Sequence, residues 1–211
     1  MGDGRISDIA ALHAAARALR ARAKARGRVP ALIFVTDPGR TPAPEAIART
    51  LPWGAGVVFR AFGAADAVEM GRRLKAIARR RGLVLLTGAD EALARAIGAD
   101  GVHLPERLAA RAGVIARRRP GWIVTAAAHS PRAVRAAARA GAHAVLVSPV
   151  FESPSPSAGR PLGPTRFAAM ARAAGIPVIA LGGVTAQRAR RLRGSGAAGL
   201  AAVGAFLQPA S

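Results

Sequence analysis

Short apolar segments alternate with longer segments rich in alanine and arginine along the whole chain. The apolar segments are continuous rather than alternating, which is typical of strands buried on both faces of a parallel sheet. We predict eight strands, at residues 31–36, 56–60, 83–87, 101–104, 123–127, 144–148, 177–181 and 199–203. The segments between them predict helices, among them 64–81, 89–97, 131–140, 165–173 and 185–193.

A helical segment precedes the first strand, and a faint repeat recurs along the chain. We expect the helix to cover residues 7–26, with Ser7 as its N-cap and Gly27 as its stop. The repeat is a Gly-Ala pair followed by strand entry, at residues 98–102, 141–145 and 196–200. Such a repeat is what a strand–helix unit used many times leaves in a sequence.

Eight strand–helix units favour an α/β fold in which residues 1–211 form a single (βα)8 TIM barrel with an extra N-terminal helix. A length of 211 residues suits one domain, and no linker interrupts it. The alternative is an open doubly wound sheet, which carries a glycine-rich loop after its first strand. Residues 36–39 show no such G-x-G-x-x-G pattern, so we favour the closed barrel.

Glycines end the last two predicted strands. Gly182 and Gly183 follow the seventh strand and precede a helix that begins at Thr185, and Gly204 follows the eighth strand. Adjacent glycines let the backbone approach a ligand closely, and a helix N-terminus presents free N–H groups to an anion. This is where TIM barrels hold phosphate groups, so we predict a small phosphorylated ligand.

The formal charge of +21 comes almost wholly from arginine. Nucleic-acid binding is one interpretation. However, the arginines are spread over nearly every predicted helix and aromatic residues make up only 4%, which leaves no stacking platform. We therefore expect no nucleic-acid partner, although the charge would attract anionic substrates.

The chain shows no apolar run long enough to span a membrane, no secretory signal and no cysteine. We expect a cytoplasmic protein without a membrane partner.

Two histidines follow predicted strands, where TIM barrels carry catalytic side chains. His129 comes after the fifth strand and directly before Ser130 and Pro131, which predict a helix start that fixes its backbone. Because histidine can take and return a proton near neutral pH, His129 is the catalytic candidate, with a structural role as the alternative. His103 ends the fourth strand and either faces the barrel mouth and substrate or fills the top layer of side chains.

Polar residues at other strand ends are candidates for substrate binding. Arg60 is the single charge in the apolar segment 57–62, and a charge there is costly unless it is paired or used on a ligand. Its fork of donors suits a phosphate or carboxylate, and a structural ion pair is the alternative. Thr36 and Ser148 end the first and sixth strands and belong to the same predicted site.

The longest irregular segment covers residues 149–164 after the sixth strand. It carries Glu152, Ser153 and Ser155 as further candidate substrate contacts. A long loop on the catalytic face is commonly a lid, and a surface excursion is the alternative. No carboxylate pair stands at the strand ends and the histidines lack ligand spacing, so we expect no metal site.

Taken together, these motifs resemble the thiamine phosphate synthase/TenI family over roughly residues 30–207. The matching segments are 32–37, 98–104, 128–130, 148–151 and 180–184, in family order. The resemblance implies a TIM barrel in thiamine biosynthesis that binds a thiazole phosphate and forms a homo-oligomer. It also implies one of two activities. The synthase joins a pyrimidine pyrophosphate to a thiazole phosphate with Mg²⁺, whereas the TenI-type enzyme is a metal-independent thiazole tautomerase.

The chain departs from the synthase pattern at several polar positions. Of the family's Gln-x-Arg-x-Lys only Arg60 remains, and the metal-binding Asn-Asp pair and second Asp fall at Gly88, Ala89 and about Leu108. The serine before the histidine becomes Ala127, and the loop's Thr-x-Thr-Lys becomes Ser-Pro-Ser-Pro at 153–156. Without these groups, the charge on departing pyrophosphate would be left largely unstabilised.

The surviving positions match the tautomerase better. His129 matches its acid/base histidine, Gly182, Gly183 and Gly204 match the phosphate cradle, and Arg60 would hold the substrate carboxylate. We therefore predict a thiazole tautomerase without a cofactor. The alternatives are a divergent synthase, which would need Mg²⁺, and a phosphate-ligand-binding barrel without catalysis.

Overall fold

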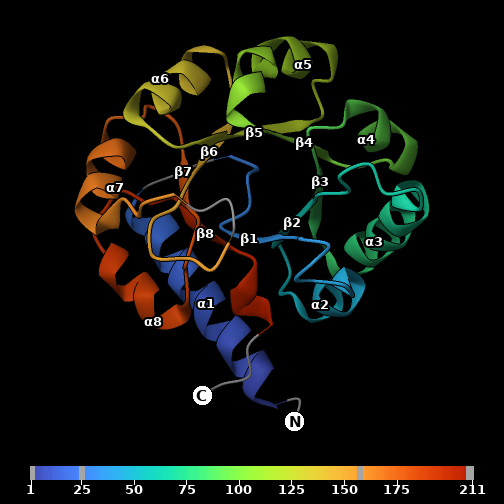
Figure 1. Ribbon diagram of the computed structural model, residues 1–211, viewed down its shortest axis with the longest axis horizontal. Coiled ribbons are helices and arrows are strands. Elements are labelled where there is room, and N and C mark those ends of the chain that lie inside the picture. Colours follow the sequence, from blue (N-terminus) through green and yellow to red (C-terminus); the bar gives the residue numbers. More distant parts are fainter. Residues whose placement is uncertain (1–2, 24–26, 156–158, 208–211) are drawn as a thin grey trace.

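A computed structural model describes residues 3–23, 27–155 and 159–207, and Figure 1 shows a ring of strands surrounded by helices. All neighbouring strands are parallel, and the sheet closes into a barrel in sequence order. The strands are β1 (Leu32–Val35), β2 (Gly56–Phe59), β3 (Val84–Gly88), β4 (Gly101–Leu104), β5 (Ile123–Ala128), β6 (Ala144–Val147), β7 (Val178–Ala180) and β8 (Gly199–Ala202). The predicted fold class is confirmed, and each strand lies within one residue of its predicted ends.

The helices follow the strands around the ring. They are α1 (Asp3–Arg22), α2 (Pro44–Thr50), α3 (Ala67–Arg81), α4 (Glu91–Ile97), α5 (Ala112–Arg118), α6 (Pro131–Arg139), α7 (Gly163–Arg172) and α8 (Ala186–Ala189). Three 3-10 turns, η1 (Glu106–Arg111), η2 (Arg190–Leu192) and η3 (Gly204–Phe206), complete the described elements. No described helix is long and apolar enough to cross a membrane.

The N-terminal helix precedes β1 as predicted, but it starts earlier than expected. It begins at Asp3, so Ser7 lies inside the helix and is not its N-cap, because the polar first turn continues the helix upstream of the serine. The predicted end at Arg26 lies outside the described residues. In the ring, α1 lies between α8 and α2 (Figure 1) and packs on β8 and η3.

The apolar strands have two buried faces because the barrel has an interior and an outer layer. Side chains such as Ile33, Val58, Leu86 and Leu146 form one buried cluster from alternate strand positions. A larger cluster joins the other strand faces to the helices. Both faces are apolar, so the polar residues that carry chemistry gather where the strands end.

Candidate functional site

A cavity of about 1670 Å³ opens at the carboxyl ends of the strands. Ten of the predicted site residues line it: Arg60, His103, His129, Ser148, Glu152, Ser153, Ser155, Gly182, Gly183 and Gly204. Residues that follow each of the eight strands contribute to its wall, as expected for the catalytic face of a TIM barrel. The ten predicted residues therefore share one cavity.

His129 is held by two hydrogen bonds from neighbouring strand ends. Its Nδ1 lies 2.7 Å from the carbonyl oxygen of Ser148, at the end of β6, and its backbone N–H donates to the carboxylate of Glu106, with 2.8 Å between N and Oε2. A carbonyl oxygen can only accept, so Nδ1 carries the proton and the neutral ring keeps its lone pair on Nε2. Ser130 caps α6 by accepting from the N–H of Ala133, which fixes the chain directly after the histidine. The exposed imidazole thus has a defined orientation and a free basic nitrogen.

His103 differs from His129 in its surroundings, which disfavour the protonated form of its ring. Its Nδ1 lies 2.9 Å from the hydroxyl of Thr125, which is fully buried on β5. Burial and, to a smaller extent, the positive charge of Arg60 together lower the pKa of His103 to about 4. The ring is therefore neutral at physiological pH and serves as a hydrogen-bonding group rather than a cation.

Arg60 takes part in an ion pair and also lines the cavity. Its Nη2 lies 2.9 Å from Oδ2 of Asp37, and its Nε donates to the carbonyl oxygen of Thr36 over 2.6 Å. Arg40 binds the same carboxylate over 3.1 Å. The hydrogen bond from Arg40 lowers the pKa of Asp37, and the charges of both arginines add to that effect. One carboxylate thus serves two guanidinium groups, which leaves a net positive charge for an anion.

The structure does not place Thr36 where the sequence predicted it, in contact with the substrate. Thr36 is buried and does not belong to the cavity wall. Its hydroxyl accepts from the backbone N–H of Arg60 over 2.9 Å, and its carbonyl oxygen accepts from the same side chain. These two contacts at the end of β1 make Thr36 a residue that orients Arg60.

The glycine turn after β7, which we define as residues 182–184, is constrained by protein as well as by a ligand. Gly182 and Gly183 have φ of 91° and 63°. A Cβ on Gly182 would lie 2.7 Å from Cα of Pro149, and one on Gly183 would lie 2.1 Å from the carbonyl oxygen of Glu152. These two glycines are therefore required by the chain after β6. Gly204, by contrast, has open space around the position of a Cβ.

The chain after β6 runs beside β7 before it leaves the barrel. The N–H groups of Val150 and Phe151 donate to the carbonyl oxygens of Leu181 and Gly182 over 2.9 and 3.0 Å. Both side chains are buried, whereas Glu152 is exposed on the cavity wall. The first part of the long loop is thus anchored; its residues 156–158 lie outside the described residues, so the lid stays a prediction.

The residues at the family's metal positions do not fit Mg²⁺. Gly88 and Ala89 offer no side-chain oxygen, and Leu108 stands at the third position. The neighbouring Asp90 uses Oδ1 to cap α4, 2.8 Å from the N–H of Leu93. Within residues 3–23, 27–155 and 159–207, no group of three or more His, Asp or Glu side chains is placed to hold a metal ion. The residues described at these positions therefore supply no ligand set for a metal-assisted step.

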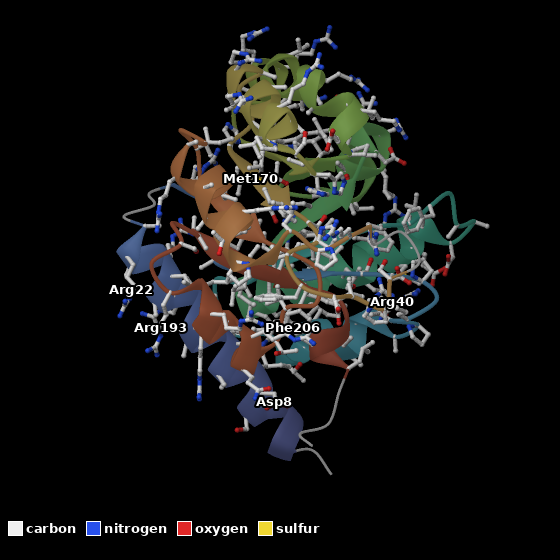
Figure 2. All side chains as sticks on the ribbon, turned by 60° about the vertical axis from the view of Figure 1, so that its left-hand side comes forward. Asp8, Arg22, Arg40, Met170, Arg193 and Phe206 are labelled. Carbon is white, nitrogen blue, oxygen red and sulfur yellow. The ribbon has the colours of Figure 1, made fainter. Side chains whose placement is uncertain are left out.

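Apart from Arg60, the arginines that surround the cavity were not among the predicted site residues. They come from several elements and are Arg40, Arg95, Arg107, Arg111, Arg160 and Arg188. Figure 2 shows Arg40 on the opposite side of the molecule from Arg22, which ends α1. With arginine on every helix, no sequence signal separates those at the cavity from those elsewhere, and only the fold does so.

The closed strand ring and its cavity define a (βα)8 barrel with a ligand site at the carboxyl ends of the strands. The sequence matches the family described as thiamine monophosphate synthase over residues 32–206. The chain therefore belongs to the thiamine monophosphate synthase family, which functions in thiamine biosynthesis.

Several relatives carry related names. The chain is 31% identical to a thiamine-phosphate synthase of Chlorobium luteolum, over 86% of this chain and 87% of the relative. It is 37% identical to the bifunctional protein ThiM/ThiE of Symbiobacterium thermophilum, over 66% of this chain but only 29% of that protein. A thiamine phosphate pyrophosphorylase structure from Pyrococcus furiosus superposes with a TM-score of 0.70 at 23% identity, covering 84% of this chain and 86% of the other. The last likeness supports the fold alone.

Proposed function

We propose that this protein is a metal-independent thiazole tautomerase that moves a proton within a thiazole carboxylate phosphate. The observation that carries the proposal is the hydrogen bond from Nδ1 of His129 to the carbonyl oxygen of Ser148, which leaves Nε2 as a free base on the cavity wall. The absence of side-chain oxygens at Gly88 and Ala89 favours this reaction over one that needs a bound metal. A proton transfer requires only a base that can also act as an acid.

In the proposed mechanism, Nε2 of His129 takes the proton from the saturated carbon of the thiazole ring. The imidazolium so formed keeps its Nδ1–H bond to the carbonyl oxygen of Ser148, which holds the ring in place and stabilises its charge. The same Nε2–H then returns the proton to the exocyclic carbon, which completes the aromatic thiazole. No atom is gained or lost, because the reaction only moves one proton.

The substrate would be held at its two anionic ends. Arg60 would bind the carboxylate near β2, while the glycine turn and Gly204 would bind the phosphate at the ends of β7 and β8. Within the described part of the chain, the N–H groups of Gly183 and Val184 have no hydrogen-bond partner and are available to an anion. Neutral His103 would offer a further hydrogen bond without competing for the proton.

A second candidate is thiamine phosphate synthase activity, which would require Mg²⁺. It is favoured by the names of the relatives, among them the thiamine-phosphate synthase of Chlorobium luteolum, which this chain covers over most of its length. The same cavity would then have to accept a pyrimidine pyrophosphate together with the thiazole phosphate. A third alternative is that the protein binds a phosphorylated thiazole without catalysing a reaction.

The test compares two reactions of the purified protein. One contains the thiazole carboxylate phosphate without metal, and the other contains pyrimidine pyrophosphate, thiazole phosphate and Mg²⁺. We expect isomerisation in the first that disappears in His129→Ala and persists in His143→Asn, a control at the exposed histidine before β6. Thiamine phosphate in the second reaction would support the synthase instead, and no product in either would support a binding protein.

A further inference from the structure

Arg188 joins the glycine turn to the chain after β6. One guanidinium nitrogen, Nη1, donates to the carbonyl oxygens of Gly183 and Glu152, each over 3.1 Å. The residue lies in α8, is half-buried and lines the cavity. Its positive charge therefore lies within hydrogen-bond reach of the turn to which we assign the phosphate.

The charge of Arg188 is not neutralised by the protein around it. Both of its acceptors are uncharged carbonyl oxygens, and no carboxylate within residues 3–23, 27–155 and 159–207 forms an ion pair with it. Nε and Nη2 make no hydrogen bond to any described residue, so these donors are left for a ligand. A half-buried cation without a counter-charge is costly unless an anion binds beside it.

The guanidinium is also held in place before any ligand arrives. The backbone N–H of Arg188 donates to Oγ1 of Thr185 over 3.2 Å, which fixes the start of α8. Its Cζ lies 5.9 Å from the ring centroid of Phe151, whose side chain is buried. A donor that is already oriented loses little freedom on binding, which increases its contribution to affinity.

Neighbouring arginines do not meet the same conditions. Arg60 follows β2 and is paired with Asp37, and we assign it to the carboxylate end of the substrate rather than to the phosphate. Arg191 also lies near Phe151, with Cζ 5.6 Å from the ring centroid, but it does not belong to the cavity wall. Arg188 lines the cavity and is bonded directly to the glycine turn through the carbonyl oxygen of Gly183.

We propose that Arg188 binds the phosphate group directly and makes the glycine turn selective for a dianionic phosphate monoester. This inference rests on the proposed function, since it assigns the phosphate end of the same site. Nη1 holds the turn through the carbonyl oxygens of Gly183 and Glu152, while Nη2 and Nε donate to phosphate oxygens. Charge-assisted bonds of this kind are stronger than those from the backbone N–H groups alone.

The experiment measures binding by calorimetry, independently of turnover. The probes are thiazole phosphate and the same thiazole with a free hydroxyl, titrated into wild type, Arg188→Gln, Arg188→Lys and Arg190→Gln. Arg190 is exposed on η2 and outside the cavity wall, so its variant removes the same charge from the same turn of chain. The titrations are repeated between pH 5.5 and 7.5, where a phosphate monoester gains its second charge with a pKa of about 6.

We expect Arg188→Gln to weaken thiazole phosphate binding by about tenfold or more, Arg188→Lys to be intermediate, and Arg190→Gln to stay within about twofold. The rise of affinity with pH should be smaller in Arg188→Gln than in wild type, an effect that a purely structural role would not produce. All other residues are identical in the two proteins, so the difference between their pH dependences isolates the contact between Arg188 and the phosphate. Equal affinity and equal pH dependence in wild type and Arg188→Gln would overturn the proposal, as would equal wild-type affinity for the two probes. Failure of the tautomerase reaction would leave these binding results unchanged, so the two ideas fail separately.

Discussion

Nδ1 of His129 lies 2.7 Å from the carbonyl oxygen of Ser148, so the end of β5 is tied to the end of β6 through an imidazole ring. The contact selects the tautomer as well as the position of the ring. A single hydrogen bond therefore links the packing of two strands to the basicity of Nε2.

Replacing His129 by asparagine should separate the structural role of this hydrogen bond from the basicity of Nε2. The amide N–H₂ of asparagine can still donate to the carbonyl oxygen of Ser148, but the residue has no base in place of Nε2. We expect kcat for the tautomerisation to fall by about 10² to 10⁴, the range of general acid–base catalysis, with thermal unfolding unchanged because the side chain is exposed. A variant that retained its rate would show that another group moves the proton.

Arg60→Met should affect substrate binding more than the chemical step. Loss of the guanidinium removes the carboxylate contact, so KM for the carboxylated substrate should rise about tenfold or more. The Kd for thiazole phosphate, which lacks the carboxylate, should change by less than about threefold. Arg73→Met is the matched control, because Arg73 forms its ion pairs with Glu45 and Glu69 on the helices, outside the cavity wall. Equal losses for both thiazoles would contradict a specific carboxylate contact.

The lowered pKa of His103 should make the free energy of unfolding depend on pH. Burial, with a smaller effect of the Arg60 charge, lowers its folded-state pKa to about 4 from the ordinary 6.5, so the unfolded chain binds a proton that the folded protein does not. The free energy of unfolding should therefore be highest above pH 6.5 and should fall, by up to roughly 3 kcal/mol from this residue, as the pH drops from 6.5 to 4.

The matched variant is His103→Asn, which can still bond to Thr125 but does not titrate. Urea unfolding at several pH values should give a shallower slope for it than for wild type. Partial desolvation and a nearby arginine also lower the pKa values of His13 and His143, and both residues remain in the variant as a common background. Parallel curves for the two proteins would mean that His103 is not buried as described.

Two glycines of the predicted cradle should respond differently to alanine. Gly183 has φ of 63°, and an added Cβ would lie 2.1 Å from the carbonyl oxygen of Glu152, so Gly183→Ala should destabilise the protein by about 2 kcal/mol or more. Gly204→Ala meets open space and should change stability by less than about 1 kcal/mol. Chemical denaturation of the two variants in parallel would check this contrast, and similar stability losses would contradict it.

The sequence predicted the barrel well because buried parallel strands leave continuous apolar segments that glycines and caps delimit. It placed the start of α1 wrongly, because the residues before Ser7 also adopt the helix and leave the serine inside it. Strand ends were enough to bring His103 and His129 to one cavity. They could not show that Thr36 orients Arg60, because the direction of a side chain at a strand end depends on the twist and register of the neighbouring strand.

The contacts missed from sequence are those between segments far apart in the chain. Asp37 was not expected to hold two arginines, and Arg188 had no sequence feature to distinguish it from the arginines around it. Gly182 and Gly183 were read as a ligand cradle, whereas the structure adds a second reason for them in the close approach of the chain after β6. Adjacent glycines in a sequence indicate a close approach to the backbone, but they do not show whether a ligand or another segment of the chain makes that approach.

The pairing of β1 with β8, in which Leu32 lies opposite Leu200, gives the barrel a late closing step. Until β8 has been synthesised, β1 and β7 each present an unpaired edge, and α1 has not yet met the strand and turn on which it packs. Exposed edges of this kind invite pairing with other chains. Contacts of such long sequence separation also slow folding. The growing chain should consequently be most prone to aggregate just before its last strand appears, and chaperones that shield strand edges should raise the yield of folded protein.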